Sequence, residues 1–145
     1  MSYCTIEDLK KKLSEAEIAR LSNDVTPTVI EETVVDELID SNTEIIDGYI
    51  RGRYPLEEVA TNSILKNICI QLTIVDLYDR RNKVKLPENL IRTRTDQFNH
   101  LKSIQRGEMT LDIEDSENRP KFFAVTSPAQ VFTDDLYTEF NQSYE

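Results

Sequence analysis

The spacing of hydrophobic residues predicts a mainly helical chain in which the longest element covers residues 29–55. Apolar residues recur there at three- and four-residue steps, which indicates an amphipathic helix with a broad buried face. Gly52 fits the position that follows a helix C-terminus, and Pro55 cannot continue a helix. The residues predicted to face the core are Ile30, Val34, Val35, Leu38, Ile39, Ile45, Ile46, Tyr49 and Ile50.

Two short helices are expected before this stretch, because two N-capping patterns lie close together. Thr5 is followed by Asp8 three residues later, and Ser14 by Glu17, and each pair fits a capping box. The chain must bend between two helices that start so near each other. The polar residues 22–28 then predict a loop.

A strongly apolar helix is expected over residues 64–80, after a connector at 56–60. Three consecutive residues could cap its start: Thr61, Asn62 and Ser63. Apolar residues occupy most of the circumference of this helix. We therefore expect it at the centre of a bundle or under a second subunit.

The last predicted helix covers residues 88–106. Pro87 suits the first turn of a helix, and Gly107 suits the position just after the end. The expected helices then number about five. They form a predicted helical domain over residues 1–107.

The pattern changes after residue 107. Residues 109–113 alternate apolar and polar side chains, which predicts a short strand or an extended arm. Aromatic residues recur in the rest of the segment, whereas disordered linkers are usually poor in them, so we expect residues 108–145 to become ordered against a partner. The predicted fold class is mainly α, a small helical bundle of about five helices with a C-terminal strand-like or extended arm.

The composition supports a helical protein, and the charge is unevenly distributed. Hydrophobic residues make up 39% and charged residues 30%, with three glycines and no tryptophan. The net charge is −10, and residues 108–145 hold nine acidic and two basic side chains. Such an arm repels nucleic acid unless a local basic patch on the helical domain overrides it.

Cys4 and Cys69 form no CxxC motif and have no histidine close in sequence, so we expect neither a zinc site nor a redox motif. Cys69 lies in an apolar run and is expected to be a buried small hydrophobe. The first residues lack the basic and apolar regions of a secretory signal, and no apolar run reaches the length of a membrane span. We therefore expect folding in a cytoplasm.

Two sequence motifs resemble those of a known family. The stretch 45–55, IIDGYIRGRYP, and the stretch 101–111, LKSIQRGEMTL, together with the opening 3–9, YCTIEDL, are similar to the small connector proteins of Mu-like phages and prophages. That family is related to the head-completion adaptor proteins of tailed phages. The similarity spans roughly residues 3–113. The family usually has a Leu-Pro step where this chain has Pro55-Leu56.

The resemblance implies a structural protein of the phage neck. Its members are helical protomers that assemble as a ring below the portal and join the capsid to the tail. The implied partners are the portal protein and a tail-completion protein, with DNA only passing through the channel. The implied location is the host cytoplasm during assembly and then the virion neck. No cofactor is implied.

Three groups of residues are candidates for subunit or partner contacts. The first is Asp47, Arg51, Arg53 and Tyr54, which could clamp a neighbouring protomer or simply form an intrahelical pair at a helix end. The second is a basic run with further cations beyond it: Arg80, Arg81, Lys83, Lys85, Arg92 and Arg94. This run could contact phosphates, contact the acidic arm of an adjacent subunit, or lie in solvent.

The third group is aromatic and lies in the arm: Phe122, Phe123, Phe132 and Tyr137. These side chains could be anchored in a groove of a neighbouring subunit or of the portal, or could pack on their own helical domain.

Two other classes of protein are alternatives to the connector. A helical DNA-binding or regulatory protein could use the basic region 80–94, or residues 5–22 as a helix-turn-helix, but the latter hold four basic and four acidic side chains. An enzyme is not expected, because no nucleophile, metal or phosphate motif is present. His100, the single histidine, has no neighbouring residues that would form a triad.

Overall fold

The computed structural model describes residues 1–81 and 85–113, which belong to one compact unit, Met1–Glu114. This part of the chain is helical and contains no strand, so the prediction of a mainly α fold is confirmed. Its six helices are α1 (Ile6–Lys10), α2 (Glu15–Ser22), α3 (Glu32–Ile50), α4 (Leu56–Val59), α5 (Ser63–Arg81) and α6 (Glu88–Arg106). The additional helix is α4, a single turn in the predicted connector.

The predicted capping residues start three of these helices. The backbone N–H and the hydroxyl of Thr5 both donate to Asp8 Oδ2, at 3.1 and 3.0 Å, before α1. Ser14 Oγ accepts from the backbone N–H of Glu17 at 3.3 Å before α2. Asn62 Oδ1 accepts from the first backbone N–H groups of α5. The side chains thereby bond backbone groups that have no partner inside the helix.

The two glycines that were predicted to follow helix ends differ in backbone conformation. Gly107 after α6 has a φ of 83°, the left-handed conformation that glycine adopts at low cost. Gly52 directly follows Arg51, the C-cap of α3, as predicted, but it does not have a positive φ. The chain instead continues through a right-handed turn, in which the backbone N–H groups of Arg53 and Tyr54 both donate to the carbonyl of Ile50.

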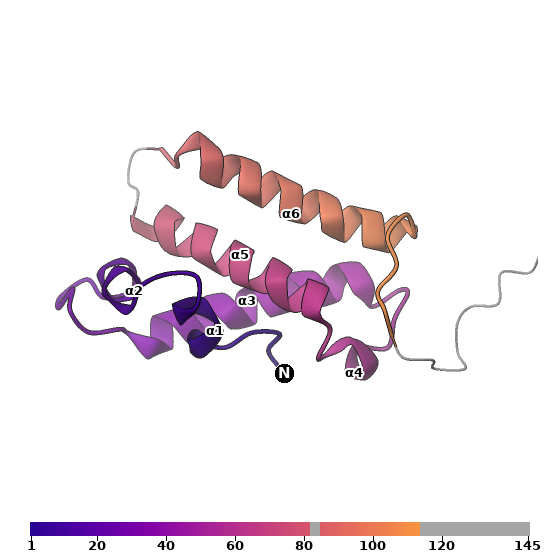
Figure 1. Cartoon of the computed structure of the whole chain (residues 1–145), viewed down its shortest axis with the longest axis horizontal. Coiled ribbons are helices and arrows are strands. Elements are labelled where there is room, and N and C mark those ends of the chain that lie inside the picture. The colour runs from indigo at the N-terminus through magenta and orange to yellow at the C-terminus, as the bar shows by residue number, and fades with distance from the viewer. Residues whose placement is uncertain (82–84, 114–145) are drawn as a thin grey trace, which may run out of the picture. The chain divides into compact units, whose positions relative to one another are not determined.

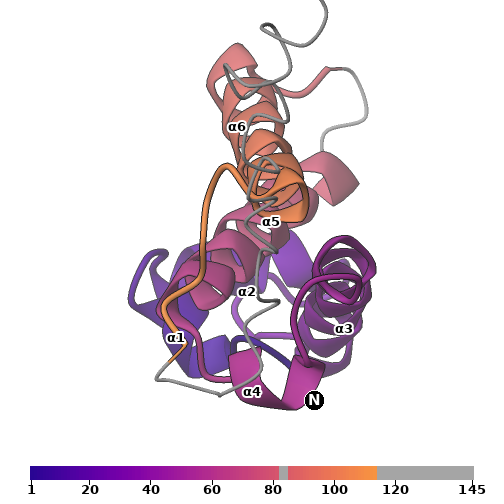
Figure 2. The same ribbon diagram turned by 90° about the vertical axis from the view of Figure 1, so that its right-hand side faces the viewer.

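Helix α5 occupies the centre of the bundle and packs against both α3 and α6, which also contact each other (Figure 1). The end-on view shows the same order, with α1 and α2 covering α5 beside α3 (Figure 2). Side chains on most of the surface of α5 are buried: Leu65, Ile68, Cys69, Ile70, Leu72, Thr73, Ile74, Val75 and Leu77. The predicted central position of this helix is therefore confirmed.

The buried face of α3 follows most of the predicted stripe, but one of its apolar residues is exposed and two polar residues are buried with it. Val35, Ile39, Ile46 and Ile50 are buried, whereas Ile45 is 37% exposed. Two polar residues, Asn42 and Thr43, are buried on the same helix. The core between α3 and α5 therefore includes polar side chains, and these must find hydrogen-bond partners there.

Residues 108–113 run from the end of α6 across the end of the bundle toward α4 (Figure 1). Leu111 is buried, and Met109 and Ile113 pack against the core. This segment forms no strand, so its alternating pattern reflects packing of one side on the helices. The remainder of the predicted arm, residues 114–145, lies outside the described residues. Over residues 1–81 and 85–113, none of the helices has the length and apolar character to cross a bilayer.

Candidate functional site

The two motifs that carry the family resemblance contact each other, although they lie far apart in the sequence. Tyr54, after α3, accepts a hydrogen bond at its hydroxyl from the backbone N–H of Leu111, at 3.2 Å. The Arg53 guanidinium carbon lies 5.7 Å from the centroid of the Tyr54 ring, within the range of a cation–π contact. A Cβ on Gly107 would lie 1.9 Å from an Arg53 nitrogen, so the guanidinium packs directly against this glycine. We call Arg53, Tyr54, Gly107 and Leu111 the motif cluster.

Asp47 bonds to another part of its own chain. Its Oδ1 accepts a hydrogen bond from the Tyr3 hydroxyl at 2.5 Å. Burial and the Asp47 carboxylate together raise the pKa of Tyr3, so the hydroxyl remains a donor at neutral pH. Within the described ranges no ion pair joins Asp47 to Arg51, which is exposed. The predicted interface residues Asp47, Arg53 and Tyr54 thus stabilise the fold of their own protomer.

The basic run after α5 is also engaged within the chain. Arg80 pairs with Asp24 and donates to the carbonyl of Leu21 at 3.1 Å. Arg81 lies 3.5 Å from Asp24 and donates to the carbonyl of Asn23. These contacts fasten the loop after α2 to the end of α5.

The structure describes some of the other predicted interface residues but not all of them. Lys85 is exposed, whereas Lys83 is outside the part of the chain that the structure describes. The aromatic candidates Phe122, Phe123, Phe132 and Tyr137 lie outside it too. Arg92 is exposed on α6, and His100 is exposed on the same helix.

Arg94 belongs to a polar network that links the three long helices. Its guanidinium donates to Asp76 at 2.9 Å and to Asp79 at 3.2 Å, both on α5. Asp76 also accepts from the Asn42 side chain at 2.8 Å, and Asn42 donates in addition to the Leu38 carbonyl at 3.0 Å. Sequence analysis missed Asn42. Its position four residues after Leu38 and four before Ile46, on the apolar stripe of α3, is the signal that could have identified it.

A second buried ionic group lies at the start of α1. Asp8 accepts from Lys66 of α5 at 2.9 Å and from Lys11 at 3.2 Å, besides both bonds from Thr5. Burial alone would raise the pKa of Asp8, but the bonds from Lys66, Lys11 and Thr5 outweigh it and hold this pKa well below its usual range. The carboxylate joins the N-terminal helix to the central helix.

The two cysteines lie side by side in the core. The Cys4 thiol donates to Cys69 Sγ at 3.2 Å, and both side chains are buried. The hydrogen bond to Cys69 and burial raise the pKa of the Cys4 thiol, so it stays protonated. The expectation that Cys69 is buried is confirmed. The contact with Cys4 was missed, because 65 residues separate the two.

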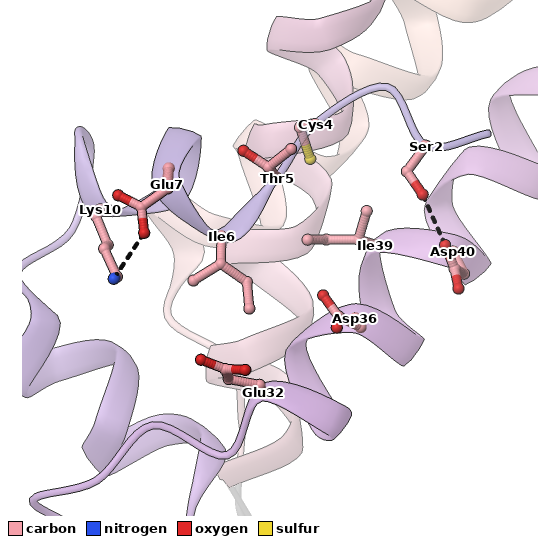
Figure 3. A pocket seen from close by; sticks show the side chains of 10 residues that line it. All are labelled: Ser2, Cys4, Thr5, Ile6, Glu7, Lys10, Glu32, Asp36, Ile39 and Asp40. Atoms are coloured by element: carbon pink, nitrogen blue, oxygen red, sulfur yellow. Dashed lines mark hydrogen bonds and ion pairs between the residues drawn. The ribbon is translucent and has the colours of Figure 1, made fainter.

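An open groove of about 530 Å³ lies between α1 and the first half of α3. Its apolar lining includes Ile6 and Ile39, and Glu32, Asp36 and Asp40 project along its α3 side (Figure 3). We call it the acidic groove. In residues 1–81 and 85–113 no three acidic, cysteine or histidine side chains are grouped so as to hold a metal ion.

Substitutions in the motif cluster should show that Gly107 and Arg53 are energetically coupled. Gly107→Ala is expected to destabilise the protein by about 2 kcal/mol, because alanine is strained at a positive φ and its Cβ displaces Arg53. In an Arg53→Ala background the same change should cost only about 1 kcal/mol, since the displaced side chain is gone. Denaturant unfolding of the four proteins of this cycle measures both values.

Gly48→Ala is the matched control for this cycle. Gly48 lies within α3, and a Cβ there meets nothing within 4 Å, so alanine should be neutral or stabilising by up to about 1 kcal/mol. Equal costs of Gly107→Ala with and without Arg53 would contradict the contact between these two residues.

Comparison with known proteins places the chain among the proteins of bacteriophages. It belongs to the family described as Bacteriophage Mu, Gp36, whose model matches residues 3–125. The resemblance to a Mu-like phage family, inferred from the motifs, is therefore confirmed, and the match continues past residue 113 into the predicted arm. No curated protein matches the chain significantly.

Proposed function

We propose that this chain is a structural head-to-tail connector, a neck adaptor of a Mu-like phage or prophage that assembles as a ring below the portal. The observation that carries the proposal is membership of the Mu Gp36 family over residues 3–125. The proposed role is assembly rather than catalysis. The proposed partners are the portal protein and a tail-completion protein, and DNA only passes through the channel of the ring.

The contacts of the described residues are compatible with a rigid building block. The motif cluster joins the ends of α3 and α6, and the Asn42–Asp76–Arg94 network joins both helices to α5. A subunit of a ring must keep its shape while its surfaces bind neighbours, and these internal contacts provide that rigidity. The surfaces left for partners are then the outer faces of the helices and the arm.

The alternative, a DNA-binding or regulatory protein that uses region 80–94, is less well supported. Arg80, Arg81 and Arg94 each pair with an aspartate of their own chain. Cations that are already paired contribute little to binding phosphates, because binding strength depends on the number of phosphate charges that the protein newly neutralises. Among the described residues of this region, Lys85 and Arg92 are exposed and form no ion pair.

The connector proposal is tested by the mass of the full-length protein in solution. We expect a species many times heavier than the 16.8 kDa chain in sedimentation, either alone or after addition of the portal protein of the same phage. The portal protein alone is the control, because it forms a large species of its own. A chain that stays monomeric and leaves the sedimentation of the portal unchanged would contradict the proposal.

A further inference from the structure

The outer face of α3 carries a row of acids that the protein itself does not neutralise. Glu32, Asp36, Asp40 and Glu44 follow one another at four-residue intervals, and all four are exposed. The helix contains no basic residue. Within the described ranges none of the four forms an ion pair, and Asp40 accepts a hydrogen bond only from the hydroxyl of Ser2.

This arrangement is unfavourable for the isolated protomer. Like charges four residues apart are neighbours on a helix surface and destabilise it. The row also borders the acidic groove, in which Ile6 and Ile39 provide apolar surface (Figure 3). Lys10, the base that lines the groove, is already paired with Glu7 at 2.8 Å and Glu15 at 3.4 Å. A basic partner with an apolar side chain would fit this surface in both charge and polarity.

The outer face of α6 has those properties. Arg92, Lys102 and Arg106 are exposed and form no ion pair in the part of the chain that the structure describes. Ile91, beside them, is 40% exposed. Helical geometry places these four residues within an arc of about 100°, which also contains the exposed acid Glu88, so the face has a net charge of about +2. From the rise per residue, the three cations span about 21 Å and the acidic row about 18 Å, so the two rows match in length.

The two faces lie on different helices of one protomer. The acidic groove lies on the side of α3 next to α1, whereas α6 packs on α3 and α5 through its buried residues Gln97, Leu101 and Ile104. In the part of the chain that the structure describes, no ion pair joins the acidic row to the exposed cations of α6, so another copy can bind both faces. Two different complementary patches on one molecule produce head-to-tail contacts, which close into a ring when the rotation between copies allows.

We infer that the acidic groove along α3 binds the basic outer face of α6 from a second copy of the chain, as the repeating contact of the ring. The inference rests on the proposed connector function and specifies its subunit interface. Salt should weaken the contact, because exposed charges are screened.

Charge reversal tests this interface, with the portal protein present throughout. One variant carries Glu32→Lys, Asp36→Lys, Asp40→Lys and Glu44→Lys, and the other carries Arg92→Glu, Lys102→Glu and Arg106→Glu. Each variant alone brings like charges together between copies, so the assembled species should be lost. Mixing the two variants, or combining all seven substitutions in one chain, restores opposite charges at each contact and should restore the assembled mass in sedimentation.

The matched control changes two exposed acids outside the proposed interface. Glu57→Lys with Glu58→Lys on α4 changes the net charge in the same direction as the α3 variant, and should assemble as the unmodified chain does. Circular dichroism and thermal unfolding of every variant verify that the helices are intact, so that lost assembly is not mistaken for lost folding.

The outcomes separate this inference from the proposed function. An unmodified chain that assembles, together with reversals that assemble equally well or are not rescued by combination, overturns the interface and leaves the connector role intact. An unmodified chain that never assembles overturns both. Loss of retention on duplex DNA in the α6 variant, with its assembled mass unchanged, would assign the α6 face to DNA and also overturn the interface.

Discussion

Replacing Asn42 by aspartate is expected to lower the free energy of unfolding by about 3 kcal/mol at pH 7. The side chain is 2% exposed, and its amide donates to Asp76 at 2.8 Å. Aspartate has nearly the same shape but no donor when ionised, so two carboxylates would face each other in a buried site with only Arg94 to offset them. The cost therefore comes from charge repulsion rather than from altered packing.

The pH dependence of the stability of Asn42→Asp tests whether charge repulsion causes the loss. Two neighbouring carboxylates raise the pKa of the pair in the folded state, so the deficit is largest at neutral pH and shrinks as the pH falls through that raised pKa. Denaturant unfolding at pH 7 and pH 4.5 measures the change. Asn99→Asp on the exposed part of α6 is the control and should stay within about 0.5 kcal/mol of the unmodified chain. A similar small effect for Asn42→Asp would show that the network does not form.

Asp8→Asn is expected to destabilise the protein by about 2 kcal/mol at pH 7. The substitution removes the negative charge that Lys66 and Lys11 neutralise, and it weakens the capping interaction with Thr5. The Asp8 side chain is 8% exposed, so solvent replaces these interactions poorly. Glu7→Gln, whose side chain is 75% exposed on the same helix, is the control and should have little effect.

The pKa of Asp8 also predicts how the destabilisation by Asp8→Asn varies with pH. Because the folded pKa lies below the unfolded value of about 3.9, the stabilisation is complete above about pH 5 and is lost as the pH falls toward the folded pKa. The difference between the unmodified chain and Asp8→Asn should therefore shrink between about pH 5 and pH 3. A difference that stays constant over this range would show that the carboxylate charge is not its source.

Local sequence signals predicted most helix boundaries, because a capping residue acts within one turn. Thr5, Ser14 and Gly107 fulfil their predicted roles. Gly52 lies just after the C-cap of α3 as predicted, but its backbone is not left-handed, since the turn after α3 brings the backbone of Tyr54 to the Ile50 carbonyl. Helix α4 was missed because four residues are too few to show a helical period.

The predicted site residues were identified as motifs, but their partners could not be. Tyr54 and Leu111 are 57 residues apart, and Arg80 and Asp24 are 56 apart, so nothing in the local pattern joins them. Charge and aromatic content marked these residues as candidates for binding. The structure shows that Arg53, Tyr54, Arg80 and Arg81 have partners in their own chain. A long-range partner therefore decides whether a charged residue near a helix end is free to bind another molecule.

The proposed function of this chain, which is to join the phage head to the tail, is tested most directly in the phage that encodes it. Electron microscopy of particles made without the chain should show heads lacking tails alongside free tails, and supplying the chain from a plasmid should restore joined particles. Complete tailed particles formed in the absence of the chain would contradict the connector function.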